Sequence, residues 1–218
     1  MTGVFITFEG IDGCGKSTQL RLLASELRVR GLELVATREP GGTTLGKRLR
    51  AALLDVEEQV DPLAELLVFA ADRAHHVRTL LAPALKANQI VLSDRYADAT
   101  VAYQGAGRGF EPWLIHDIVQ LATGGLTPDL TLLFDLSVAD AAARTRRRLA
   151  SKTTDRLDSE DAEFHTRVRN AYLKIARAEP GRFRVIDARG AVQQTQAMVM
   201  DIVMPFLKDR GLINETGQ

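Results

Sequence analysis

Residues 4–19 read VFITFEGIDGCGKSTQ, and this stretch decides the fold. The residues at 4–8 are all apolar, β-branched or aromatic, which predicts a buried β-strand. Residues 18–30 follow with leucines at helical spacing and predict an α-helix. Between the two, residues 10–17 match G-x-x-x-x-G-K-[S/T], the pattern of a phosphate-binding P-loop, which requires a strand before it and a helix after it.

The residue types of this motif suit a bound triphosphate. Its three glycines allow the backbone to curl and direct several N–H groups at an anion. Lys16 can reach the β- and γ-phosphates, and the Ser17 hydroxyl can ligate Mg²⁺. The alternative is a glycine-rich turn that happens to precede a lysine, which the strand–helix context disfavours. We therefore expect a nucleoside triphosphate to be bound with Mg²⁺ by Gly10, Asp12, Gly13, Cys14, Gly15, Lys16, Ser17 and Thr18.

Composition favours one compact cytoplasmic domain over residues 1–218. The chain is 45% hydrophobic, its 28 basic and 28 acidic residues balance, and no apolar run approaches the ~20 residues of a membrane span. Nothing global therefore points to nucleic acid or a membrane as a partner. Cys14 is the single cysteine, which excludes an internal disulfide. Because it lies at a helix N-terminus, we expect a thiolate-prone side chain that bound nucleotide protects, with a buried, inert thiol as the alternative.

Strand-like and helix-like segments alternate along the rest of the chain. Short apolar strands are predicted at 33–37, 90–93, 129–136 and 183–187. Helices are predicted at 43–54, from 62 onward, and at 111–122, 138–149, 159–178 and 192–207. Residues 97–109 are polar and glycine-rich, as in a binding loop or short helix. This alternation predicts an α/β protein of the P-loop NTPase type, with three layers and a five-stranded parallel sheet flanked by helices.

Charged residues follow two of these strands, at the edge where open parallel sheets bind ligands. Arg38 follows the strand at 33–37, and Asp94 and Arg95 follow the strand at 90–93. Asp94 can hold Mg²⁺ together with Ser17, and Arg95 can clamp a phosphate. A solvated loop arginine and a surface ion pair are the alternative interpretations.

Two further segments carry candidate binding residues. Phe69 and Arg73 are four positions apart on one helix, so they share a face that can stack on and hydrogen-bond a nucleobase. Phe69 taken alone is more typical of a core residue. Six basic residues lie between 144 and 156, which suits a lid over about 144–158 that closes on a triphosphate, although such a charge run also occurs on solvated faces.

In this order, the motifs resemble those of the thymidylate kinase family, bacterial type. The likeness rests on FEGIDGCGKST, REPGG, SDRY, AYQGAGRG and an arginine-rich segment before Asp155-Arg156-Leu157, and it covers nearly the whole chain. It implies a nucleoside monophosphate kinase that converts ATP and dTMP into ADP and dTDP with Mg²⁺. It also implies a homodimer.

The resemblance assigns roles to matching residues. It places Phe69 against thymine and Arg73 at its O4 edge, with Thr100 and Gln104 as further base contacts. Tyr103 would lie beneath the deoxyribose.

For the sugar hydroxyl and the phosphates, the resemblance implies Asp12 on the 3′-hydroxyl and Arg38 and Arg95 on the monophosphate. The implied catalytic residues are Lys16, Asp94, Arg95 and Arg148. Some family members carry a basic residue in the variable part of the P-loop, but residues 11–14 here hold none. The resemblance therefore implies that the lid supplies the cation for the transferring phosphate, from Arg148, Arg146 or Arg147.

Three other functions are compatible with a P-loop. One is a kinase for a different nucleoside monophosphate. A GTP-dependent switch is disfavoured because the sequence N-K-x-D is absent. A nucleotide-binding module without catalysis is disfavoured because Lys16, Ser17, Asp94 and Arg95 are all present.

Overall fold

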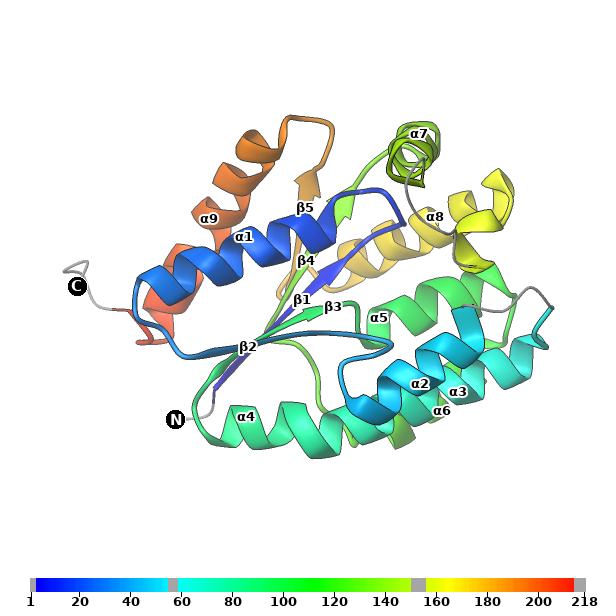
Figure 1. Ribbon diagram of the computed structural model, residues 1–218, viewed down its shortest axis with the longest axis horizontal. Helices are drawn as coiled ribbons and strands as arrows, with labels where there is room; N and C mark the ends of the chain where they lie inside the picture. The colour runs from blue at the N-terminus through cyan, green and yellow to red at the C-terminus, as the bar shows by residue number, and fades with distance from the viewer. Residues whose placement is uncertain (1–2, 55–58, 150–155, 214–218) are drawn as a thin grey trace.

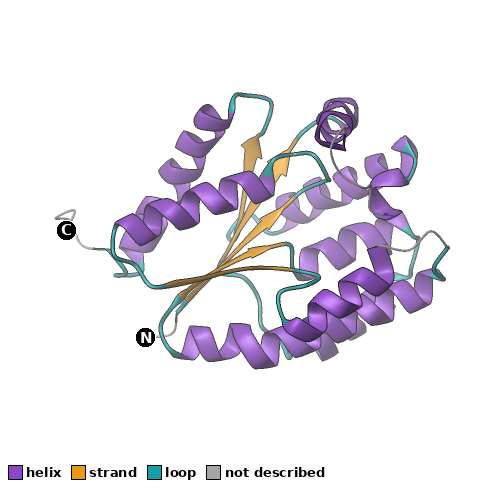
Figure 2. Cartoon of the chain, viewed as in Figure 1, coloured by secondary structure: helices purple, strands orange, loops and turns teal. Residues whose placement is uncertain are grey.

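The computed structural model describes residues 3–54, 59–149 and 156–213. Its centre is a parallel sheet with helices on both sides (Figure 1, Figure 2). The strands are β1 (Val4–Glu9), β2 (Leu34–Arg38), β3 (Ile90–Asp94), β4 (Leu130–Asp135) and β5 (Phe183–Asp187). They lie in the order β2-β3-β1-β4-β5, and every pairing is parallel. The predicted three-layer α/β fold is therefore confirmed.

The helices follow the predicted order. They are α1 (Lys16–Val29), α2 (Thr44–Leu54), α3 (Pro62–His76), α4 (Ala82–Lys86), α5 (Ala97–Thr100), α6 (Pro112–Thr123), α7 (Val138–Leu149), α8 (Ala162–Ala178) and α9 (Val192–Asp209). A π-helical turn, Val77–Leu81, joins α3 to α4, so the helix predicted from Pro62 runs on to Lys86. A second π-helical turn, Val101–Gly107, continues α5 through the region predicted as a loop or short helix. Such turns often occur at functional sites.

The sheet owes its burial to helices on both faces. α1 and α9 pack side by side on one face, and α4 and α8 lie on the opposite side of the sheet (Figure 1). The central strand β1 has all six residues buried, which explains its uninterrupted run of β-branched and aromatic side chains. No helix in residues 3–54, 59–149 and 156–213 is both long and apolar enough to cross a membrane.

Strand register brings the functional loops together. Phe8 in β1 and Arg38 in β2 are both register partners of Asp94 in β3. The P-loop after β1 and the loops after β2 and β3 therefore begin at the same height on the carboxyl edge of the sheet. This is the edge at which ligands bind in open parallel sheets.

Side chains just before α2 and α3 cap these two helices. The carboxylate of Asp61 accepts hydrogen bonds from the backbone N–H groups of Leu63 (2.9 Å) and Ala64 (3.2 Å) at the start of α3. The hydroxyl of Thr43 accepts from the Gly46 N–H (2.9 Å) at the start of α2. Both caps satisfy N–H groups that have no partner within the helix.

Replacing Asp61 with alanine should lower the free energy of unfolding by about 1 kcal/mol, because two N–H groups of α3 lose their cap. Urea denaturation of the two proteins measures this difference. Glu111→Ala is a matched control, since Glu111 occupies the same position before Pro112 in α6 but its side chain makes no capping bond. Equal losses for both variants would contradict the capping role of Asp61.

Candidate functional site

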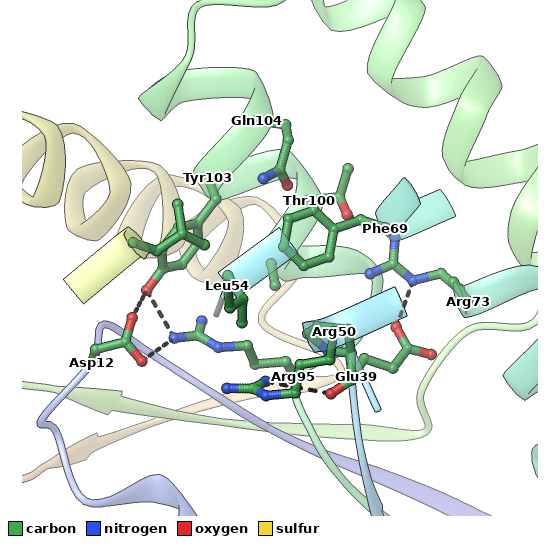
Figure 3. A pocket seen from close by; sticks show the side chains of 13 residues that line it. Asp12, Glu39, Arg50, Leu54, Phe69, Arg73, Arg95, Thr100, Tyr103 and Gln104 are labelled. Carbon is green, nitrogen blue, oxygen red and sulfur yellow. Dashed lines mark hydrogen bonds and ion pairs between the residues drawn. The ribbon is translucent and has the colours of Figure 1, made fainter. Parts of the chain in front are cut away.

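A pocket opens at the carboxyl edge of the sheet (Figure 3). Its wall brings together residues from the P-loop, the loop after β2, α2, α3, and the segment after β3. Among the predicted substrate contacts, the pocket is lined by Asp12, Phe69, Arg73, Arg95, Thr100, Tyr103 and Gln104. The other lining residues are Glu39, Pro40, Arg50, Leu54, Ala99 and Leu157.

One end of the pocket is built around the carboxylate of Asp12. Arg95 donates to Asp12 Oδ1 (2.7 Å), and the Tyr103 hydroxyl donates to Asp12 Oδ2 (2.8 Å). The Arg95 guanidinium also lies over the Tyr103 ring, 4.6 Å from its centroid. Burial opposes ionisation of Asp12, but the charges of Arg95 and Lys16 and the Tyr103 hydrogen bond hold its pKa well below the usual range. Asp12 is therefore a charged acceptor between two cations.

Arg95 is held in an uncommon backbone conformation. Its φ is 73°, in the left-handed region, where the backbone of any residue other than glycine is strained. The Ser93 hydroxyl donates to the Arg95 carbonyl (2.8 Å), and the Arg95 N–H donates to the Phe8 carbonyl (3.0 Å). Such strain is concentrated at functional sites, and here it directs the Arg95 side chain toward Asp12.

Behind Arg95 lies a fully buried carboxyl, Glu9. It accepts hydrogen bonds from the Tyr172 hydroxyl (2.7 Å) and from the Tyr96 N–H (2.7 Å), and Arg95 donates to Tyr172 (3.2 Å). Burial, reinforced by the nearby charge of Asp98, raises the pKa of Glu9 to about 8, although Arg95 acts in the opposite direction. Glu9 and Tyr172 thus hold the Arg95 guanidinium through a chain of hydrogen bonds.

Arg73 is held by hydrogen bonds at the opposite end of the pocket. Its guanidinium donates to Glu39 Oε2 (2.7 Å), to the Thr100 hydroxyl (2.7 Å) and to the Tyr96 carbonyl (2.9 Å). Glu39 Oε1 is also bonded to His76 Nδ1 (2.9 Å). An arginine has five N–H donors, so donors of Arg73 are left for a ligand in the pocket.

The helical spacing that predicted a shared face is confirmed. Phe69 is half-buried and Arg73 is buried, and both line the pocket from α3. Gln104 lies across from them in the π-helical turn and donates through Nε2 to Glu65 (2.9 Å). An aromatic face, a guanidinium and an amide therefore converge at this end of the pocket, as Figure 3 shows.

The P-loop has the conformation that its glycines predict. Gly10, Gly13 and Gly15 have φ values of 137°, 84° and 96°. At Gly13 a Cβ atom would lie 2.3 Å from the Ala141 carbonyl oxygen, so a larger residue cannot fit. Lys16 is buried at the start of α1, 3.5 Å from Asp12. This arrangement gives N–H groups, a helix N-terminus and a cation at one place, which suits the phosphates of a nucleotide.

The donor set next to the P-loop fits Mg²⁺. The Ser17 hydroxyl donates to Asp94 Oδ2, and the other oxygen of Asp94 is buried without a hydrogen-bond partner in the described structure. Hard oxygen ligands and a single carboxylate are what Mg²⁺ uses when water and phosphate oxygens complete its shell. The described residues contain no group of three acidic, His or Cys side chains that could form an all-protein metal site.

Lys16 and Asp94 lie at the P-loop and do not line the pocket, and Arg38 and Arg148 are placed at neither. Arg38 is exposed at the end of β2 and does not line the pocket. The side chain of Arg148 lies outside the described part of the structure, as do residues 150–155 of the predicted lid. Arg146 and Arg147 are exposed on α7. The roles of Arg38 and Arg148 stay predictions.

The expectation of a thiolate-prone Cys14 is wrong. Only 2% of Cys14 is exposed, and its side chain packs into the hydrophobic core with Ile11. Burial raises the pKa of its thiol, and the opposing charges of Lys16 and Arg95 do not overcome this. The backbone N–H of Lys16 bonds the thiol and favours the anion, but the cost of burial outweighs it.

Sequence reasoning missed Glu39 and Arg50, which line the pocket, and Glu65, which binds the lining residue Gln104. Glu39 lies in the REPGG motif, yet only the neighbouring Arg38 was selected. Arg50 was one of several basic residues on α2, and nothing in the local pattern distinguishes it. Glu65 could have been found by the spacing already used for its helix, because Glu65, Phe69 and Arg73 repeat every four residues.

The raised pKa of Glu9 predicts a pH-dependent stability. Between about pH 4.5 and 8 the folded protein keeps a proton on Glu9 that the unfolded chain releases. The free energy of unfolding should therefore fall by up to about 1.4 kcal/mol for each unit that the pH rises in this range. In Glu9→Gln this contribution is absent. The stability difference, wild type minus variant, should therefore decrease from pH 5.5 to 7.5. Urea denaturation at both pH values measures it, and a constant difference would refute the assignment.

Comparisons with known proteins agree with this geometry. A family model described as thymidylate kinase matches residues 8–199. The thymidylate kinase of Clavibacter sepedonicus is 54% identical over 188 residues, which cover 86% of this chain and 88% of that protein. The thymidylate kinase of Geotalea uraniireducens (strain Rf4) is 46% identical over 211 residues, covering 95% of this chain and 99% of its own length.

A solved structure shows the same architecture. The crystal structure of thymidylate kinase from Ehrlichia chaffeensis superposes with a TM-score of 0.77 at 34% sequence identity, covering 94% of this chain and 99% of that chain. Sequence and fold thus agree over nearly the whole length. The chain belongs to the thymidylate kinase family.

Proposed function

We propose that the enzyme transfers the γ-phosphate of ATP to dTMP in the presence of Mg²⁺ and that the pocket in Figure 3 holds the dTMP. Phosphorylation of dTMP to dTDP is the activity of the family to which the chain belongs. The observation that carries the site assignment is the division of one pocket into two ends beside a P-loop. Phe69, Arg73 and Gln104 form a nucleobase end, while Asp12, Arg95 and Tyr103 form a sugar and phosphate end.

At the base end, Phe69 stacks on the thymine ring and Arg73 donates to its O4 atom. Thr100 and Gln104 complete the contacts to the edge of the base. Arginine has donors but no acceptor, so Arg73 suits the carbonyl of thymine or uracil and not the amino group of cytosine.

At the other end, Asp12 accepts from the 3′-hydroxyl and Arg95 binds the monophosphate. Tyr103 packs under the deoxyribose and leaves no room for a 2′-hydroxyl. Arg38 completes the contacts to the monophosphate, supported by its register position beside Asp94 at the same edge. The attacking phosphate oxygen is already anionic and needs no strong general base, so these residues act by positioning it in line with the donor.

On the donor side, the P-loop holds the ATP phosphates and Lys16 neutralises charge on the transferring group. Ser17 and Asp94 would hold Mg²⁺, which would neutralise charge on the phosphates. The lid at about 144–158 supplies Arg148 as a further cation, with Arg146 and Arg147 as the neighbouring candidates. In this proposal the whole chain is one domain that carries the lid. A cytoplasmic location is proposed on family membership alone.

A homodimer is the proposed assembly, and the outer surface of two helices supports it. α3 and α6 pack against each other. Leu63 and Leu67 of α3 are 46% and 51% exposed, and Trp113 and Leu121 of α6 are 65% and 77% exposed. Four large apolar side chains on adjacent helices are typical of an interface between subunits.

The acceptor preference tests the proposed function. In a coupled assay of ADP release, dTMP should give the highest kcat/KM. dUMP should be modestly poorer, because the 5-methyl group contributes about 1 kcal/mol of apolar burial. dCMP and UMP should be much poorer, because cytosine leaves polar groups of the site unpaired and the ribose meets Tyr103. Equal values for dTMP and either dCMP or UMP would contradict the pocket assignment.

Leu67→Glu tests the dimer. Light scattering after size exclusion should give the wild type twice the 23.9 kDa chain mass, and the variant should shift toward the monomer because a charge is forced into an apolar contact. Leu22→Glu on α1 is the matched control, since Leu22 is also exposed, at 39%, but lies on the other face of the sheet. A wild-type monomer, or no shift in Leu67→Glu, would count against this interface.

A further inference from the structure

Glu65 is a buried charge directly beside the nucleobase end of the pocket. It lies on α3 one turn before Phe69 and two turns before Arg73, so the three share one face of the helix. No part of Glu65 is exposed. A carboxylate in such a place needs several donors to offset the loss of water.

Those donors come from two other segments of the chain. Glu65 Oε1 accepts from Gln104 Nε2 (2.9 Å) and from Arg108 Nε (3.2 Å). Glu65 Oε2 accepts from Arg108 Nη2 (3.0 Å) and from Arg156 Nη2. Burial opposes ionisation of Glu65, but the bonds from Arg108, Arg156 and Gln104 lower its pKa. Glu65 is therefore an ionised group that can only accept hydrogen bonds.

This fixes the orientation of the Gln104 amide. Because Glu65 can only accept, Gln104 must turn its NH₂ group toward Glu65. Its carbonyl oxygen then points away from Glu65, and no residue in the described ranges donates to it. Gln104 lines the pocket, so this oxygen is the acceptor that it offers to a bound base.

The Gln104 acceptor and the Arg73 donor together match the hydrogen-bonding pattern of one class of pyrimidine. Thymine and uracil carry an N3–H donor next to the O4 acceptor, which pair with the Gln104 carbonyl and the Arg73 guanidinium. Cytosine carries an N3 acceptor next to an amino donor, so both of its groups meet a group of the same kind.

The same carboxylate also holds part of the pocket wall. Arg156 donates through Nη2 to Glu65 and through Nε to the carbonyl of Leu53 (3.2 Å), which anchors it between α3 and the end of α2. The next residue, Leu157, lines the pocket, as does Leu54. Glu65 thereby ties the segment after residue 155 to the place where the base is read.

We propose that Glu65 is a positioning residue for base selection, which fixes the Gln104 amide with its carbonyl toward the substrate and holds Arg156 and Leu157 against the same pocket. This inference rests on the proposed binding of dTMP in that pocket. Glu65 itself does not touch the substrate in this arrangement.

The decisive variant is Glu65→Gln. Glu65 Oε2 accepts from the Nη2 atoms of both Arg108 and Arg156, which are donors only, so the carbonyl of the new amide should take the Oε2 position. Its NH₂ group then takes the Oε1 position, where it faces Gln104 and loses the bond from Arg108 Nε. Gln104 would then turn its own NH₂ group toward the pocket, where it suits cytosine and not thymine. The ratio of kcat/KM for dTMP to that for dCMP should fall at least about tenfold, which corresponds to one misplaced hydrogen bond.

A double-mutant cycle separates this role from a structural one. Gln104→Leu alone should lower the ratio, and Glu65→Gln should lower it no further in that background, because its effect passes through Gln104. A ratio that stays at the wild-type value in Glu65→Gln, or losses that multiply in the double variant, would overturn the proposal. A purely structural role would lower kcat for both acceptors and leave the ratio unchanged.

The controls cover folding and the underlying function. Asp129→Asn removes a carboxylate that pairs with Arg210 (2.9 Å) outside the pocket, and it should keep the wild-type ratio. If Glu65→Gln does not fold, Glu65→Asp keeps the charge for the two arginines but withdraws it from Gln104, so the ratio should still fall, and an unchanged ratio would overturn the proposal. Wild-type enzyme that used dCMP as well as dTMP would instead refute the proposed function, and this inference with it.

Discussion

The ion pair between Arg95 and Asp12 joins the two loops on which the site depends. Because β1 and β3 are neighbours in register, the P-loop and the loop after β3 leave the sheet side by side. The strained backbone of Arg95 then directs its guanidinium across to Asp12 at 2.7 Å. Tyr103 binds both partners, so the segment after β3 is fixed to the P-loop. The acceptor pocket and the phosphate loop are thereby held in one geometry, as in-line transfer requires.

Three buried carboxyl groups stand behind the polar residues of the pocket. Glu9 supports Arg95 through Tyr172, Glu39 binds Arg73, and Glu65 binds Gln104. An isolated carboxylate in such surroundings would be strongly destabilising, and each is offset by several donors. The pattern is a preorganised site: the donors and acceptors that line the pocket are already oriented by these three carboxyl groups.

The pKa differs in direction between Glu65 and Glu9 because their partners differ. Glu65 pairs directly with arginine, whereas Glu9 reaches Arg95 only through a tyrosine hydroxyl. Direct pairing lowers the pKa of Glu65, while burial wins at Glu9 and raises its pKa to about 8. The same residue type is thus an ionised acceptor in one place and a proton-holding group in another.

The sequence predicted what depends on local pattern and failed where distant residues decide. Periodicity and glycine positions were sufficient for the five strands and the P-loop. Spacing along one helix was sufficient to predict that Phe69 and Arg73 share a face. The burial of Cys14 depends on packing against the core, which outweighs the influence of the helix N-terminus. Arg156 and Glu65 are 91 positions apart, so no local pattern could show that they meet.

Helix α3 has two stripes of residues on opposite sides, one facing the pocket and one facing outward. Glu65, Phe69 and Arg73 repeat every four residues on the pocket face, while Leu63 and Leu67 repeat at the same interval two positions away. Since successive residues turn by about 100°, the two stripes point in opposite directions. The buried hydrogen bonds of the first stripe fix the rotation of the helix about its axis, and that rotation presents the second stripe outward. Under the proposed function, the residues that read the base therefore also determine which apolar surface α3 would present to a second subunit.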